Sequence, residues 1–342
     1  MDTYSLGFWN LENLFAPEGF PDREPWIAQR VAKDLDGWTE ALFTRKVAQL
    51  AVGIAAMNGG AGPDLLGVCE VENRFVLDRL TQALNAALPA RRYDVIHADS
   101  TKDQRGIDTA FVFDANRLST NPAEVFSHFV MRRTGTRDIT QATFKTQSGQ
   151  EFVALSNHWP SRSGGYHTLT QGYRMTAGET LSYWHERIRE VKGNNTAVIA
   201  MGDLNDDPAD PSVVIHANSS RERDDIENAT SPRFYNLAWN YLRQSVRTVS
   251  GKQRLIYGTL YYQGDANIFD QILVSRAFLR GPGPFRVREE TAHIEALPAM
   301  VHDSKNEGPI RFGLPRGNAE KNVNTSGFSD HFPVSVTIEV AS

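Results

Sequence analysis

Residues 197–208 read AVIAMGDLNDDP, a five-residue apolar run followed directly by a polar, turn-forming segment. Residues 65–71, LLGVCEV, form a second apolar run, with Glu70 near its end. Short apolar runs of about four to eight residues are typical of strands buried in a packed sheet. Because polar side chains such as Asp203 and Asn205 gather just past such strands, the pattern predicts packed sheets, outer helices and a site at one rim.

The remaining elements follow from hydrophobic spacing. Residues 40–57, 73–88 and about 170–192 carry apolar residues at helical spacing, and Thr39 and Asn73 are the expected N-caps of the first two helices. Further strands are predicted at 5–9, 93–97, 109–113, 124–131, 140–146, 151–157, 254–262, 268–274 and 333–340. Many strands with few helices indicate an α/β protein.

Composition sets the protein class. The chain has 342 residues, 36 Lys and Arg against 41 Asp and Glu, a net charge of −5, 40% hydrophobic and 23% charged residues. These values exclude a disordered, collagen-like or coiled-coil protein. We expect one domain over residues 1–342, with irregular loops at about 205–235 and 280–328. The mild acidity argues against coating nucleic acid by bulk charge, but it allows contact with a phosphate chain in a local cleft.

Location and assembly are weakly constrained. The N-terminus has no basic segment followed by an apolar one, so we expect a cytoplasmic protein, or a secreted or periplasmic one if a signal peptide had been removed. The longest apolar runs are far shorter than the roughly 20 residues of a membrane helix, and we expect no membrane insertion. The single cysteine, Cys69, excludes an internal disulfide framework and a multi-cysteine zinc site. A monomer is expected.

Seven motifs, each beside an apolar run, carry a family resemblance. They are FWNLENLF at 8–15, GVCEVEN at 67–73, RGIDTAFVFD at 105–114, SNHWPSR at 156–162, MGDLNDDP at 201–208, IFDQILVS at 268–275 and GFSDHFPV at 327–334. In this order they resemble the endonuclease/exonuclease/phosphatase superfamily, which includes deoxyribonuclease I, exonuclease III, neutral sphingomyelinases and inositol polyphosphate 5-phosphatases. The resemblance implies a four-layer α-β-β-α sandwich in which two mixed β-sheets face each other, with helices on both outsides.

The resemblance implies a divalent metal, Mg²⁺ or Mn²⁺, with Ca²⁺ as an alternative. Glu70 ends an apolar strand, where a carboxylate is costly unless it is paired, and it is the expected main ligand. Glu12 falls where some relatives have a second carboxylate near the metal. Asp330 is expected either to ligate the metal or to orient His331. Asn10 would donate to a phosphate oxygen or hold Glu70 in place.

The same resemblance distributes the catalytic roles. Asp203 is expected to orient and deprotonate the attacking water, and Asn205 to donate a hydrogen bond to the phosphoryl oxygen as charge builds there. His331 would contact the scissile phosphate or share the base role. Asp270 matches a position whose carboxylate orients an active-site histidine, although the sequence leaves open which carboxylate pairs with which histidine.

His158 is the expected general acid. Deoxyribonuclease I-like and sphingomyelinase-like members carry a histidine here that pairs with an acidic residue from another strand, and Asp108 is the predicted partner. A histidine with a carboxylate behind it stays partly protonated near neutral pH and can protonate a leaving oxygen. A core-edge histidine bonded to backbone is the structural alternative.

Several basic residues are candidate contacts for substrate. Arg105 and Arg162 are candidate phosphate contacts, with ordinary solvent-exposed arginines as the alternative. Arg132, Arg133 and Arg137 would track a nucleic-acid backbone or, as we favour, form a solvated turn.

Three functions compete. A metal-dependent nuclease acting on DNA is favoured; a phosphatase or phosphodiesterase for a lipid headgroup, inositol phosphate or other small phosphoester is the alternative. The complete polar set argues against the third, a catalytically inactive scaffold.

Overall fold

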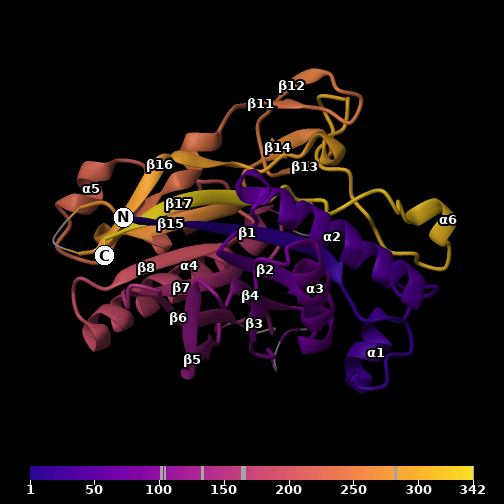
Figure 1. The fold of residues 1–342 in the computed structure, drawn as a ribbon, viewed down its shortest axis with the longest axis horizontal. Coiled ribbons are helices and arrows are strands. Elements are labelled where there is room, and N and C mark those ends of the chain that lie inside the picture. The colour runs from indigo at the N-terminus through magenta and orange to yellow at the C-terminus, as the bar shows by residue number, and fades with distance from the viewer. Residues whose placement is uncertain (101–102, 104, 132–134, 163–166, 281–282, 342) are drawn as a thin grey trace.

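Two β-sheets packed face to face form the centre of the computed structural model (Figure 1). The structure describes residues 1–100, 103, 105–131, 135–162, 167–280 and 283–341, with side chains of 167–169 excepted. The first sheet has the order β16 (Phe285–Ile294), β17 (Val334–Val340), β1 (Asp2–Leu14), β2 (Leu65–Val71), β4 (Asp108–Asp114) and β3 (Tyr93–His97). The second has the order β5 (Leu118–His128), β6 (Ile139–Thr146), β7 (Glu151–His158), β8 (Ala197–Asp203), β15 (Asp270–Ser275), β10 (Phe234–Asn236) and β9 (Ser219–Ser220).

Helices and short hairpins complete the architecture. The helices are α1 (Pro25–Val31), α2 (Glu40–Gly60), α3 (Arg74–Ala87), α4 (His167–Lys192), α5 (Arg223–Glu227) and α6 (Ala319–Asn322). Separate two-stranded hairpins are made by β11 (Gln244–Arg247) with β12 (Gln253–Ile256) and by β13 (Leu260–Tyr262) with β14 (Asp265–Asn267). The predicted caps are confirmed: Thr39 accepts from the Leu42 amide and Asn73 from the Val76 amide. Among the described residues, no helix is both long enough and apolar enough to cross a bilayer.

Alternation along the strands separates two apolar layers. In β8, Ile199 and Met201 belong to the core between the sheets, whereas Val198 and Ala200 belong to a second core with Leu181 of α4. The sheets approach closely at Gly67 of β2, where an added Cβ would lie 2.7 Å from the Met201 sulfur. Side chains from both faces of the second sheet are therefore buried, as expected for a sandwich with outer helices.

Strand direction brings the predicted site residues to one rim. β1 runs parallel to β2, and β7 runs parallel to β8, so the C-terminal ends of each pair lie together. β15 and β17 run antiparallel to β8 and β1, which places the start of β15 and the loop before β17 at that same rim. Asp203 pairs in register with both His158 and Asp270.

The structure corrects three sequence predictions. Residues 254–262 are not one strand; they contribute to β12 and β13 in different hairpins. The segment 280–328, predicted to be irregular, contains the long edge strand β16. The segment 205–235 contains β9 and α5 as well as irregular backbone. Each missed element is short or half-exposed, so its hydrophobic periodicity is weak.

Candidate active site

Strained backbone shapes the rim where β1, β2 and β8 end. Glu70 has a φ of 61° and Asn205 a φ of 51°, and Glu12 and Asn13 both have a φ of 52°. The β1–β2 register shifts between Asn10 and Leu14, and the β2–β4 register shifts between Cys69 and Val71. Left-handed conformations cost non-glycine residues free energy and occur preferentially at functional sites. In a regular strand the Glu70 side chain would follow the face-to-face alternation of β2. The bulges change its direction.

Asp203 is buried at the centre of the rim with few compensating partners. Its Oδ2 accepts from Asn10 Nδ2 over 3.1 Å, and its Oδ1 accepts from the Asn205 amide over 2.9 Å. Burial, helped by the charge of Asp270, raises the pKa of Asp203 to about 6. Asn10 therefore holds Asp203, whereas the sequence suggested a phosphate oxygen or Glu70 as its partner. The Asn205 side chain donates to the Trp159 carbonyl over 3.0 Å.

His331 faces three carboxylates. Its Nδ1 lies 2.7 Å from Asp270 Oδ2, while its Nε2 lies 3.8 Å from Asp203 Oδ2 and 4.0 Å from Asp330 Oδ1. Burial lowers the pKa of His331, but the negative charges of Asp270 and Asp203 outweigh it and raise that pKa well above 6.5. The pairing that sequence left open is thus Asp270 with His331, and the imidazole is cationic near neutral pH.

His158 has different surroundings from those predicted. Arg137 Nε donates to His158 Nδ1 over 3.1 Å, and the Arg137 Nη2 group lies 2.6 Å from His158 Nε2. Burial and the adjacent Arg137 charge lower the pKa of His158 well below 6.5. The predicted partner, Asp108, instead lies 3.0 Å from His97 Nε2 and accepts from the Ser100 amide. A partly protonated His158 backed by Asp108 is therefore wrong for this structure.

Glu70 lies between Arg105 and the neutral His158 at the edge of the rim. Its Oε1 lies 3.4 Å from Arg105 Nη1 and 3.7 Å from His158 Nε2, and its Oε2 accepts from the Asn13 amide over 2.8 Å. Burial would raise the pKa of Glu70, but the charges of Arg105 and Arg137 hold it below its usual value. Glu70 is ionised near neutral pH, as a metal ligand must be. Arg105 also donates from Nη2 to Asn13 Oδ1 over 2.7 Å, and its role as a phosphate contact stays a prediction.

The Glu12 carboxylate binds other groups of the protein with both of its oxygens. Its Oε1 accepts from Arg311 Nε over 2.7 Å, and its Oε2 accepts from the amides of Phe312 and Gly313 over 3.0 and 3.1 Å. The fully buried Lys46 ammonium lies 3.8 Å from the same carboxylate. Both oxygens are engaged, so the prediction of Glu12 as a second metal ligand is not supported. Glu12 ties the end of β1 to the 311–313 segment.

Arg162 is also an internal anchor. It lies 3.0 Å from Asp206 Oδ1 and 2.6 Å from Asp210 Oδ2, donates to the Asn205 carbonyl, and covers the Phe269 ring. These contacts occupy the Arg162 guanidinium, which was predicted to bind a substrate phosphate. Arg162 instead fixes the loop that follows Asp203.

Three residues of this region were missed or misjudged from sequence. Arg137, predicted to lie in a solvated turn, is 6% exposed and contacts His158; Arg132 and Arg133 lie outside the described residues. His97 pairs with Asp108, and Cys69 lies within 4.8 Å of ligand atoms of His158 and Asp203. No local pattern marks these residues, because their contacts join separate strands.

The donor set fits a hard divalent cation. Glu70 and Asp330 offer carboxylate oxygens at the rim beside Asp203, and oxygen donors are those that Mg²⁺, Mn²⁺ and Ca²⁺ prefer. A softer metal on Cys69, His158 and Asp203 is disfavoured, because burial and the charge of Asp203 raise the pKa of the Cys69 thiol well above 9.

Comparison with known proteins gives one sequence match and several structural ones. The profile of the Endonuclease/Exonuclease/phosphatase family matches residues 5–340. No curated protein matches the sequence. A humanised TDP2 from D. rerio is 16% identical with a TM-score of 0.55, covering 98% of this chain and 99% of that chain. A mannosyl-6-phosphatase of Bacteroides thetaiotaomicron VPI-5482 is 15% identical with a TM-score of 0.54, covering 98% and 99%. The human Nocturnin catalytic domain with bound sulfate is 15% identical with a TM-score of 0.51, covering 99% and 95%. At such identities the structures show a shared fold.

Proposed function

The chain belongs to the endonuclease/exonuclease/phosphatase family, and we propose that it is a divalent-metal-dependent phosphodiesterase, a nuclease that hydrolyses DNA. The observation that carries the proposal is the buried Asp203 carboxylate between Asn10 and the cationic His331, which Asp270 holds, beside Glu70. This set provides a base, a positive donor and a ligand carboxylate at one rim.

Glu70, with Asp330, would hold the cation, and the cation supplies positive charge to the phosphate oxygens. Asp203 accepts the proton of the attacking water. Burial raises the pKa of Asp203 to about 6, which makes its carboxylate a better base than an exposed aspartate. Asn10 and the Asn205 amide fix its two oxygens, so the direction of proton transfer is set before substrate arrives.

The cationic His331 stabilises negative charge on the phosphoryl group. Asp270 holds Nδ1, so the Nε2–H is directed toward the side where Asp203 and Asp330 lie. A neutral His158 accepts from Arg137, while its Nε2 lies 3.7 Å from both Glu70 Oε1 and Asp203 Oδ2. Leaving-group protonation is therefore assigned to His331, the histidine that carries a proton near neutral pH.

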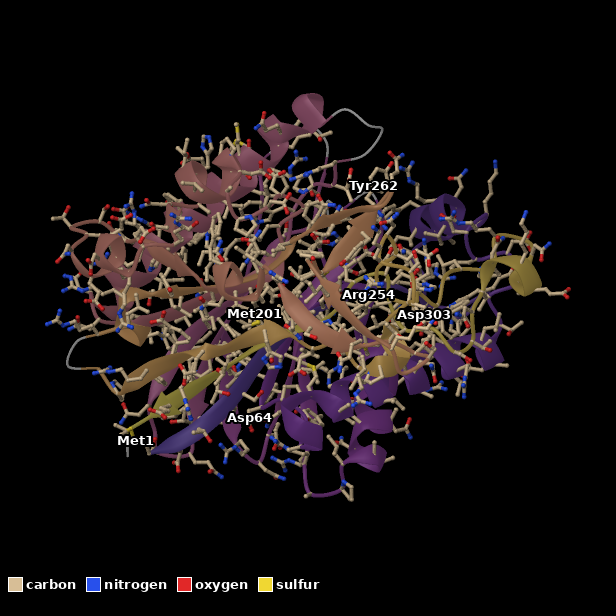
Figure 2. All side chains as sticks on the ribbon, turned by 90° about the horizontal axis from the view of Figure 1, so that it is seen from above. Met1, Asp64, Met201, Arg254, Tyr262 and Asp303 are labelled. Carbon is tan, nitrogen blue, oxygen red and sulfur yellow. The ribbon has the colours of Figure 1, made fainter. Side chains whose placement is uncertain are left out.

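An adjacent hairpin supports an extended substrate. Leu260 of β13 forms an antiparallel bridge with His331, so their side chains share one face of that pairing. Tyr262, two residues further, points to the same face and is 60% exposed, about 7 Å along the strand. Figure 2 shows Tyr262 and Arg254 on the side of the molecule away from Met1. An exposed aromatic ring on the strand that bridges to His331 suits stacking on a nucleobase.

The test is a substrate panel in Mg²⁺ or Mn²⁺ with plasmid DNA, linear duplex DNA, RNA, bis-p-nitrophenyl phosphate and a phosphomonoester. We expect DNA cleavage by the wild type and none by Asp203→Asn, which controls for contaminating nucleases. Tyr262→Ala should weaken DNA hydrolysis by about tenfold through KM, as expected for loss of one stacked base, and leave bis-p-nitrophenyl phosphate unaffected. Hydrolysis of the phosphomonoester alone would replace the nuclease with a phosphatase.

A further inference from the structure

A polar hollow lies at the end of the second sheet opposite to the catalytic rim. It has a volume of about 610 Å³ and is lined by His185 and Arg189 of α4, Thr196 before β8, Arg233 before β10 and Arg276 after β15. β8 separates Thr196 from Asp203, and seven strand residues span about 20 Å. In Figure 1, α5, whose Glu227 also lines the hollow, lies near the two termini, and β13–β14 lie well to the right of it. The hollow is therefore separate from the site described above.

Positive charge dominates this hollow in a chain with a net charge of −5. Of the ion pairs among the described residues, none involves Arg189 or Arg276, and the Arg233 guanidinium lies a loose 3.9 Å from Asp225. The acidic lining residue, Glu227, has both oxygens engaged, by Arg223 at 2.6 Å and by Arg280 at 3.3 Å. Its charge is thus neutralised within the protein. Three arginines line the hollow, and one of them, Arg233, also donates from Nε to Asn218 Oδ1 over 3.0 Å.

A buried nitrogen without a partner supports a ligand here independently. The His185 side chain is 2% exposed and its ring stacks on Phe234 at 4.0 Å between centroids. Its Nε2 is buried and has no hydrogen-bond partner among the described residues, and neither does Nε of Arg189. Burial and the Arg189 charge lower the pKa of His185 to about 3, so the ring is neutral near pH 7. A neutral imidazole whose Nε2 carries the proton can donate to an anion.

The presence of Arg189 has a simpler explanation, which needs no ligand, because this residue lies in the last turn of α4. Cations are favoured in the last turn of a helix, where carbonyl groups lack intrahelical donors. This effect does not account for Arg233 or Arg276, which come from other elements, nor for the unpartnered His185 nitrogen. Convergence of three elements and a buried donor on one polar hollow is the arrangement of an oxyanion site.

We propose that this hollow is a second anion site, which binds a phosphate group, free or as a small phosphomonoester, remote from the catalytic rim. The arginines supply charge-assisted donors, and His185 supplies the buried donor that fixes the orientation of the group. At about 610 Å³ the hollow is large enough for a phosphorylated small molecule.

The test is titration calorimetry of the full chain with inorganic phosphate, and separately with glycerol 3-phosphate, in excess EDTA to suppress metal-dependent binding at the rim. We expect one ligand per chain. The double variant Arg189→Gln/Arg276→Gln should bind at least about tenfold more weakly, since charge-assisted hydrogen bonds are lost. Arg221→Gln, an exposed arginine paired with Glu222, is the matched control and should bind as the wild type does.

Two further variants distinguish phosphate bound in the hollow from phosphate bound at the catalytic rim. His331→Gln removes the cation from the rim and should leave this binding unchanged. His185→Phe keeps a ring on Phe234 but removes the nitrogens; it should weaken phosphate binding without lowering Tm in phosphate-free buffer. Binding lost in His331→Gln but kept in the arginine double variant would place phosphate at the rim and overturn the proposal. Absence of binding to either ligand would also overturn it.

Discussion

The turn after β8 holds two buried carboxylates in opposite surroundings. Asp206 lies 3.0 Å from Arg162 Nε and 2.7 Å from Arg174 Nε, and accepts from the Ser212 hydroxyl over 2.6 Å. Asp203, three residues earlier, accepts from an asparagine side chain and a backbone amide; the cationic His331 Nε2 lies 3.8 Å away and the neutral His158 Nε2 lies 3.7 Å away. One carboxylate is neutralised to hold the loop, and the other is kept able to accept a proton.

Glu12 and Glu70 differ in the same way, one being fully neutralised and the other only in part. Glu12 is saturated by Arg311, two backbone amides and Lys46, while Glu70 keeps Oε1 facing Arg105 and His158 at distances beyond a strong ion pair. A buried carboxylate with complete hydrogen bonding supports structure, and one with incomplete neutralisation is available to bind a cation or a proton.

The largest expected effect is on turnover in Asp203→Asn. The amide cannot accept the proton of the attacking water, so kcat should fall by about 10²–10⁴-fold, the scale of lost general-base catalysis. The matched variant Asp206→Asn should retain the activity of whatever fraction is folded. Rates on DNA at saturating Mg²⁺, normalised to folded protein, distinguish the two; comparable losses of kcat in both would remove the distinction.

Asp206→Asn should instead lower the free energy of unfolding by about 3–5 kcal/mol, the usual cost of breaking a buried ion pair by removing one partner. Arg174 is 0% exposed and faces this carboxylate, so its charge loses a close counter-charge. Urea denaturation measures the change. If Asp206→Asn proves as stable as the wild type, the loop is held by other contacts.

The pH dependence of stability should differ between wild type and Asp203→Asn. Burial raises the pKa of Asp203 to about 6, so the folded state binds more protons than the unfolded state between about pH 4 and pH 6. The contribution of Asp203 to stability is therefore lost as pH rises through that window. In EDTA, Asp203→Asn should gain about 1–3 kcal/mol relative to wild type between pH 4.5 and pH 7. A constant difference across that range would mean that Asp203 has an ordinary pKa.

The smallest effect on activity is expected for Arg162→Gln. Because its guanidinium holds Asp206 and Asp210, the variant should lose about 1.5–3 kcal/mol of stability, the range for hydrogen bonds to charged groups. KM for DNA should stay within about twofold of wild type, since Arg162 is assigned no phosphate contact. A large rise in KM at unchanged stability would restore the substrate-binding role.

Much of the fold could be predicted because β2 and β8 are largely apolar runs bounded by turn residues, and α2 and α3 have capped amphipathic patterns. β16 was missed because an edge strand with exposed polar residues has no buried periodicity. The hairpin strands β11–β14 are three or four residues long, too short for a periodic signal.

The site could be predicted by residue type but not by partner. Family motifs place Asp203, His331, Asp270 and Glu70 at strand ends, and the structure brings them to one rim. They do not reveal that Asp108 pairs with His97 or that Arg137 is buried against His158, because each contact joins segments whose approach depends on sheet register. Partner choice is a tertiary property that a single sequence does not encode locally.

The most direct test of the central claim is the rate of DNA cleavage as a function of Mg²⁺ concentration for the wild type and Glu70→Gln. We expect no cleavage in excess EDTA, full recovery on adding Mg²⁺, and a Mg²⁺ midpoint raised by at least about tenfold in Glu70→Gln, because a charged oxygen ligand is replaced by a neutral one. Wild-type cleavage that persists in excess EDTA, or an unchanged midpoint in Glu70→Gln, would contradict a divalent cation held by Glu70 at this rim.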